Sequence, residues 1–288
     1  MSPQGASIAA RAPNHLGDGV MALPAMHALA ALGPLTIHAP AWGADLYAEV
    51  DATVAPRQAF RADLAVLFAP SLRAALEARR SRRIVGTPTD FRRLLLTDVV
   101  PAQTHQADTY GALARAAGAH PSGAPTYGVR GRTPSLPPAH IGLNPLAKGG
   151  TTREWPHFAA LARELVAAGH RVVFYAGPGE AERLAPIAAD HLQAVGLPLP
   201  DFAAALDRCA VFVSNDSGAA HFARACNTPT VVVHGSTSAA RTGPHGAVAL
   251  EHAVPCHPCY RPTCSVGLGC LGTPVSRVLA AVQSCSPS

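Results

Sequence analysis

The segment 211–235, which reads VFVSNDSGAAHFARACNTPTVVVHG, predicts a strand, a loop, a helix and a second strand in direct succession. A strand that returns through a helix to another strand is typical of a parallel α/β sheet. The loop 215–221 falls where the helix begins, and a helix N-terminus presents unpaired N–H groups and the positive end of a dipole. Ligands of open α/β sheets bind at this end of the strands. We therefore expect a phosphate-bearing ligand here, and the candidate residues are Asp216, Ser217, Gly218 and His221.

Alternating strand and helix patterns run through the rest of the 288 residues, enough chain for two ordinary α/β domains. The alternation is interrupted at 120–140 by a stretch rich in proline and glycine, which is typical of a linker. The fold class is therefore predicted as α/β, with two doubly wound, Rossmann-like domains at 1–135 and 136–288. Such domains commonly face each other across a cleft that holds the ligand.

Composition argues against several classes of protein. The net charge is +5 and only 5% of the residues are aromatic, which disfavours a nucleic-acid-binding surface. No signal-peptide pattern is visible, and no apolar run approaches the ~18 residues that a membrane span needs. A cytoplasmic protein is therefore expected. In that compartment the seven cysteines favour free thiols or a metal over disulfides.

A carboxylate stands between two glycines in the loop 14–19, after the first expected strand and before a helix expected at 20–32. Asp18 has two interpretations at such a turn. It is the cap of the following helix, or it is a general base that points toward a ligand.

A second polar loop follows the strand expected at 141–144. It combines cations, hydroxyls and a glycine pair, groups that suit diphosphate oxygens. An ordinary solvated loop with Trp155 as a core anchor is the alternative. The candidate residues are Lys148, Thr151, Thr152 and Arg153.

A third loop, 177–180, follows the next strand. Gly177 permits close approach of a nucleotide. Glu180 either meets a ribose or caps its own helix, and both interpretations stay open.

The tail carries a cluster of cysteines with the spacing Cys-x2-Cys-x4-Cys-x5-Cys. Four thiolates within fifteen residues suit a compact tetrahedral site for a structural zinc or iron. Free thiols, or disulfides formed on oxidation, are the alternative. The candidate ligands are Cys256, Cys259, Cys264 and Cys270.

Three of these segments together resemble the bacterial heptosyltransferases of glycosyltransferase family 9. They are the Gly17-Asp18 turn, the run 151–156 that ends in Trp-Pro, and the loop 215–221 with its Asp-Ser-Gly-x-x-His pattern. The resemblance implies a GT-B fold with an acceptor-binding N-terminal domain and a nucleotide-sugar-binding C-terminal domain. It also implies inverting transfer of a heptose from an ADP-sugar to a lipopolysaccharide core or another glycan or protein acceptor, with no cofactor required for the chemistry. Peripheral contact with the inner membrane is left open.

The resemblance also implies roles for individual residues. Asp18 would deprotonate the acceptor hydroxyl, and Ser217 with Gly218 would bind the diphosphate. Arg153 stands where the family has a lysine and would neutralise the leaving ADP, a task that Lys148 could share. Asp216 and His221 would hold the sugar or order the loop. Two alternatives remain: a nucleotide-binding GT-B protein without turnover, and an enzyme that uses a different nucleotide sugar.

Overall fold

The structure is a computed structural model, and it describes residues 5–129, 131, 135–148 and 150–285. The chain divides into two compact units, Met1–Thr126 and Tyr127–Ser288. The division falls inside the Pro- and Gly-rich segment 120–140. Among the described residues, no helix combines the length and apolar character required to cross a membrane.

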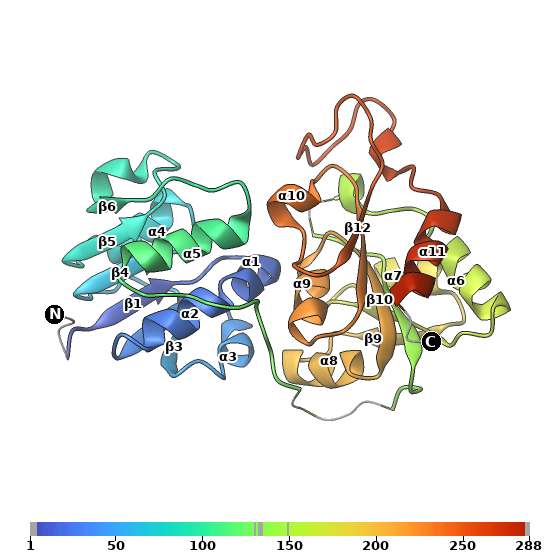
Figure 1. Cartoon of the computed structure of the whole chain (residues 1–288), viewed down its shortest axis with the longest axis horizontal. Helices are drawn as coiled ribbons and strands as arrows, with labels where there is room; N and C mark the ends of the chain where they lie inside the picture. The colour runs from blue at the N-terminus through green and yellow to red at the C-terminus, as the bar shows by residue number, and fades with distance from the viewer. Residues whose placement is uncertain (1–4, 130, 132–134, 149, 286–288) are drawn as a thin grey trace. The chain divides into compact units, whose positions relative to one another are not determined.

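The first unit is built on a six-stranded sheet with the order β3-β2-β1-β4-β5-β6 (Figure 1). All neighbouring strands pair in parallel. The strands are β1 (Ile8–Arg11), β2 (Leu35–Ala39), β3 (Ala52–Pro56), β4 (Leu64–Leu67), β5 (Arg83–Gly86) and β6 (Asp98–Val99). The helices are α1 (Leu16–Met21), α2 (Leu23–Ala30), α3 (Gly43–Leu46), α4 (Leu72–Ala78) and α5 (Gln106–Ala116).

The central strand β1 is buried along its whole length, as expected of a strand covered on both faces. Its last residue, Arg11, donates from Nε to Glu77 Oε2 at 2.6 Å, and both side chains are nearly inaccessible. Nη2 of the same guanidinium donates to Asn14 Oδ1 at 3.2 Å. This buried ion pair therefore fixes the start of the loop that follows β1.

Helix α1 begins inside the segment that the sequence predicts to be a loop, and it ends at Met21. The helix expected at 20–32 is thus divided into α1 and α2, because Pro24 at the start of α2 cannot donate a backbone hydrogen bond. Figure 1 shows α2 beside α5, against which it packs.

The second unit contains another parallel six-stranded sheet, with the order β12-β11-β10-β7-β8-β9. Numbered within its own unit and read from the other edge, this order is the same as that of the first sheet. The strands are β7 (His140–Asn144), β8 (Val172–Ala176), β9 (Leu192–Val195), β10 (Cys209–Asn215), β11 (Thr230–His234) and β12 (Val248–Glu251). The helices are α6 (Phe158–Ala167), α7 (Ala181–Ala188), α8 (Leu199–Leu206), α9 (Gly218–Ala225), α10 (Ala239–Thr242) and α11 (Val275–Cys285).

The core of the second unit lies between the sheet and a pair of helices. Leu161 and Leu165 of α6 and Val278 of α11 pack with the buried residues of β7, β10 and β11. Helices α6 and α11 lie side by side (Figure 1). The prediction of two doubly wound α/β sheets is confirmed.

Candidate active site

The polar loops of the second unit meet at one edge of its sheet. Strands β11, β10, β7 and β8 are consecutive and parallel, so the loops that follow them are neighbours. The strand order reverses between β10 and β7, and crevices at such a reversal are where ligands of open α/β sheets bind. The chain thus brings together the loops after β7, β8 and β10 that the sequence singles out.

Asn215 links two of these loops directly. Its fully buried amide accepts a hydrogen bond from the Trp155 backbone N–H at 2.9 Å and donates to the Pro145 carbonyl at 2.6 Å. The Trp155 indole is also anchored, because Nε1 donates to the Thr273 carbonyl at 2.9 Å. One side chain therefore fixes the loop after β7 against the start of α9. The sequence places Asn215 in the loop but assigns it no role.

The N-terminus of α9 combines groups of the kind that suit an anion. Ser217 is its N-cap residue, but the Ser217 side chain makes no capping hydrogen bond to the helix. Instead its Oγ lies 3.0 Å from Ser214 Oγ. Ser217 and Gly218 are both partly exposed, so the first N–H groups of an eight-residue helix open toward the sheet edge.

Two titratable candidates of this loop are largely enclosed. Asp216 and His221 are each 6% exposed. Asp216 Oδ2 accepts a hydrogen bond from Thr242 Oγ1 at 3.3 Å. That contact ties the loop to α10, so ordering the loop is a task that the Asp216 side chain already performs.

His234, at the end of β11, is a neighbour that sequence reasoning missed. It is fully buried, and its Nε2 has no hydrogen-bond partner among the described residues. Burial lowers the pKa of His234, while the charges of Asp216 and Glu251 act in the opposite direction. Its position as the last residue of a strand at the ligand-binding edge was the available signal.

The candidates of the loop after β7 separate into two groups. Lys148 and Thr151 are exposed and Arg153 is half-buried. Thr152 is 1% exposed, and its Oγ1 donates to the Arg261 carbonyl at 2.8 Å. The Thr152 hydroxyl therefore holds the cysteine-rich tail, whereas the other three side chains remain accessible to a ligand.

The loop after β8 is closed by its own carboxylate. Glu180 Oε2 accepts the Gly177 N–H at 2.7 Å, and Oε1 lies 3.7 Å from Arg183 Nη1. Glu180 is the N-cap residue of α7, but its side chain makes no capping hydrogen bond to that helix. The structure therefore places this carboxylate in a turn-stabilising position, with part of its surface exposed.

Asp18 lies in the first unit, in the first turn of α1. The N-cap residue of α1 is His15, so the interpretation of Asp18 as the cap is wrong. Gly19 is required by packing, because a Cβ at this position would lie 2.6 Å from the Trp42 ring. Oδ1 of Asp18 accepts a hydrogen bond from the Tyr110 hydroxyl at 3.0 Å.

The four predicted metal ligands lie between β12 and α11. Cys264 Sγ accepts the N–H groups of Val266 and Leu268, each at 3.4 Å, and these bonds lower the pKa of its thiol. Burial raises the pKa of Cys270, and the charges of the other three thiols add to this effect. The donor set suits zinc or iron. However, among the described residues no three His, Cys, Asp or Glu side chains come together closely enough to hold a metal ion.

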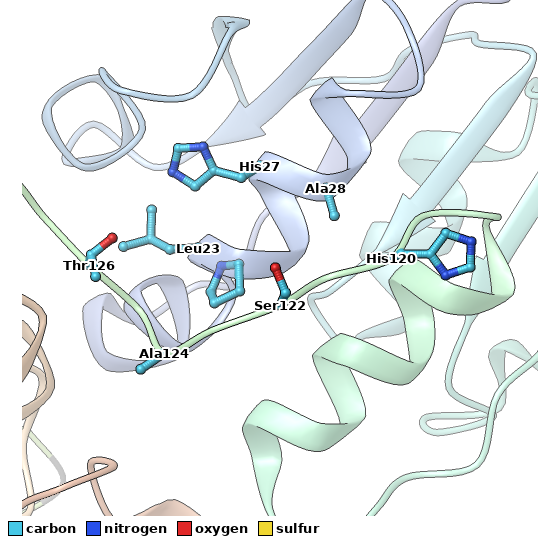
Figure 2. Close-up of a pocket in the computed structure, with 8 residues that line it drawn as sticks. Leu23, His27, Ala28, His120, Ser122, Ala124 and Thr126 are labelled. Atoms are coloured by element: carbon cyan, nitrogen blue, oxygen red, sulfur yellow. The ribbon is translucent and has the colours of Figure 1, made fainter.

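A groove of about 410 Å³ lies in the first unit, between α2 and the segment after α5 (Figure 2). Figure 2 shows that the imidazole rings of His27 and His120 point away from each other. The polar groups of this groove do not converge on one point, so we do not regard it as the candidate site. Its lining residues are Leu23, Pro24, His27, Ala28, His120, Ser122, Ala124 and Thr126.

Comparison with known proteins gives a consistent result. The model of glycosyltransferase family 9 (heptosyltransferase) matches residues 103–268. Lipooligosaccharide heptosyltransferase 2 of Haemophilus influenzae is 33% identical over 119 residues, which are 36% of this chain and 33% of that protein. Lipopolysaccharide heptosyltransferase 2 of Escherichia coli is 31% identical over 115 residues, with the same coverage. The aligned region thus spans about a third of the length of these curated relatives.

Solved structures match over almost the whole chain and show the fold. The E. coli ADP-heptose lipopolysaccharide heptosyltransferase II has a TM-score of 0.78 at 23% identity, covering 97% of this chain and 98% of that one. A family 9 glycosyl transferase from Veillonella parvula has a TM-score of 0.79 at 19% identity, covering 99% and 98%. The iron-containing glycosyltransferase TibC of enterotoxigenic E. coli has a TM-score of 0.66 at 14% identity, covering 97% and 78%.

Proposed function

The chain belongs to glycosyltransferase family 9, the heptosyltransferases, and from that premise we propose that it transfers a heptose from ADP-heptose to a lipopolysaccharide core. Its relatives support this donor and this acceptor, because they are lipooligosaccharide and lipopolysaccharide heptosyltransferases, and one of the similar solved structures is an ADP-heptose enzyme. A different glycan or a protein remains the alternative acceptor. On the same proposal the protein works in the cytoplasm, and peripheral contact with the inner membrane stays open.

The observation that carries the proposal is the Asn215 link between the loop after β7 and the start of α9. It fixes Trp155, two residues after the half-buried Arg153, against Asn215, two residues before the N-cap residue of α9, whose side chain is not used for capping. N–H groups, hydroxyls and cations are what a diphosphate requires. We assign the diphosphate of the donor to Ser217, Gly218 and Arg153, with Lys148 as a second cation.

We propose a single displacement with Asp18 as the general base. Asp18 takes the proton of the acceptor hydroxyl while the acceptor oxygen bonds to the anomeric carbon. The bond from that carbon to the diphosphate breaks, and ADP leaves with the electron pair. Positive charge and backbone N–H groups stabilise the charge that develops on the diphosphate. Displacement from the opposite face inverts the anomeric configuration.

A zinc or iron held by Cys256, Cys259, Cys264 and Cys270 is a separate proposal with a structural role only. The two N–H bonds to Cys264 support it, because thiolates are the metal-binding form of cysteine. Closing the site requires the four thiols to come closer together than they lie here. Metal analysis of protein purified without added metal decides the question, and a clearly substoichiometric content would refute it.

ADP release from ADP-heptose, measured with and without a lipopolysaccharide-core acceptor, tests the proposed function. We expect acceptor-dependent release by the wild type and none by Asp18→Asn, with ADP binding retained in the variant. Binding of ADP without release under any condition would favour a protein without turnover. Tighter binding of UDP or GDP than of ADP would favour a different nucleotide sugar. The anomeric configuration of the product, determined by NMR, tests inversion.

A further inference from the structure

We propose that Tyr110 is a positioning residue for the reaction, because its hydroxyl holds the Asp18 carboxylate in the orientation needed to accept a proton. This inference rests on the proposed role of Asp18 as general base. It gives a role in the reaction to a residue on α5 that is 92 positions away from Asp18 in the sequence.

The contact between the two side chains is direct. The Tyr110 hydroxyl lies 3.0 Å from Asp18 Oδ1. Tyr110 is only 2% exposed, whereas Asp18 is partly exposed. The phenol ring is fixed by an edge-on contact with Phe68, with the ring centroids 5.6 Å apart. A rigid, buried donor therefore holds one oxygen of a carboxylate that solvent and substrate can reach.

In this hydrogen bond Tyr110 is the donor, and the burial of its side chain is the reason. Burial raises the pKa of Tyr110 well above its ordinary value, and the charge of Asp18 adds to the effect. The phenol therefore stays protonated at neutral pH, so Tyr110 donates and Asp18 accepts. The Gln106 side chain acts on Tyr110 in the opposite direction, lowering its pKa. A group that lowers the pKa of a phenol favours the phenolate oxygen as an acceptor, so the Gln106 amide does not compete with Asp18 for the phenol hydrogen.

A second tyrosine near Asp18 provides a natural control. Tyr47, next to α3, is fully buried, and its hydroxyl has no hydrogen-bond partner among the described residues. Burial raises the pKa of Tyr47, and the charge of Asp18 adds to this, so the two groups interact electrostatically. Tyr47→Phe and Tyr110→Phe thus remove the same atom from the same neighbourhood, but only one of them breaks a hydrogen bond to Asp18.

Other titratable groups on these elements must be considered when a pH profile is read. Helix α1 packs against α2, α3 and α5. Apart from Asp18 and the two tyrosines, the titratable or charged groups on α1 and these helices, or at their N-caps, are His15, His27, Asp45, His105, Asp108 and Arg115. All of them are retained in both tyrosine variants, so a difference between the variants reports on the lost hydroxyl.

The test is the pH dependence of kcat in the wild type, Tyr110→Phe and Tyr47→Phe, with ADP-heptose and a lipopolysaccharide-core acceptor. Tyr110→Phe is expected to lower kcat about 10- to 100-fold, which corresponds to the loss of one hydrogen bond to a charged group. The acid limb of its pH profile of kcat moves to higher pH, because a carboxylate that has lost its hydrogen-bond donor is protonated more readily. The donor KM is unchanged. Tyr47→Phe keeps the wild-type acid limb.

Each outcome separates this inference from the proposed function. Full turnover in Asp18→Asn would refute the role of Asp18 itself. An inactive Asp18→Asn together with a folded Tyr110→Phe of wild-type kcat and acid limb would overturn only the positioning role. Equal shifts in the two tyrosine variants would also overturn it. If Tyr110→Phe does not fold, Gln106→Ala replaces it: a smaller shift in the same direction supports the inference, and an unmoved limb overturns it.

Discussion

Asn215→Ala is the substitution that most directly tests how the proposed donor site is held together. It removes an amide that satisfies two backbone groups, the Trp155 N–H at 2.9 Å and the Pro145 carbonyl at 2.6 Å. Both residues are buried, so water has little access to replace the lost partner. Each buried group left without a partner costs about 1–3 kcal/mol, which gives about 2–6 kcal/mol for the pair.

The expected loss of stability is measured as a decrease in the free energy of unfolding, with unfolding in urea monitored by circular dichroism. Asn215→Asp keeps the acceptor for Trp155 but places a buried carboxylate against the Pro145 carbonyl, so at neutral pH its loss of stability is expected to be at least as large as that of Asn215→Ala. Calorimetry with ADP should show weaker binding for both variants, because the loop after β7 is no longer fixed against α9. Gln193→Ala, at an exposed position on the edge strand β9, is the control and should stay within about 0.5 kcal/mol of the wild type.

Two results would refute this reasoning. One is a loss in Asn215→Ala no larger than that of Gln193→Ala, which would show that the two backbone groups find other partners. The other is a destabilised Asn215→Ala with unchanged ADP affinity, which would separate the link between the loops from nucleotide binding.

Three further predictions concern the rest of the chain. Glu77→Ala removes the carboxylate that pairs with the buried Arg11 guanidinium and should lower the free energy of unfolding in urea by about 3–5 kcal/mol. Arg73→Ala removes the exposed partner of Glu77 and should lower it by less than about 1 kcal/mol. Equal losses in the two variants would contradict this prediction. Gly19→Ala places a methyl group 2.6 Å from the Trp42 ring and should lower stability by about 1–3 kcal/mol, seen as a reduced Tm. Burial raises the pKa of Cys209 to about 12, so its thiol stays protonated at lower pH and reacts with iodoacetamide only after unfolding; mass-spectrometric detection of rapid labelling in the folded protein at pH ~8 would argue against this.

Much of the fold could be predicted, because the alternation of strand and helix patterns is a local property of the chain. The boundaries near Asp18 could not. The sequence predicts a loop at 14–19, but α1 begins at Leu16 because Gly17 and Gly19 are packed as helical residues, the latter against Trp42. That contact is tertiary, so no local pattern indicates it.

In the candidate site, too, the features that depend on local sequence could be predicted, whereas contacts between residues far apart in the sequence could not. The loops at 145–155 and 215–218 could be predicted to lie together, because both follow parallel strands. The hydrogen bonds that individual side chains make could not be predicted. Thr152 was expected to meet phosphate, yet its hydroxyl donates to Arg261, 109 positions away. Tyr110, as the partner of Asp18, likewise depends on how α5 packs.

Each compact unit contains one of the two tryptophans of the chain, so the intrinsic fluorescence of each unit can be observed separately. Trp42 packs against Gly19, beside the proposed base, and Trp155 is held by Asn215 in the loop that we assign to the donor. Replacing either by phenylalanine leaves a single indole whose emission reports on one half of the chain. Under the proposed assignment of acceptor and donor to the two units, the binding of each can then be followed by fluorescence as a separate event in the same molecule, without an attached dye.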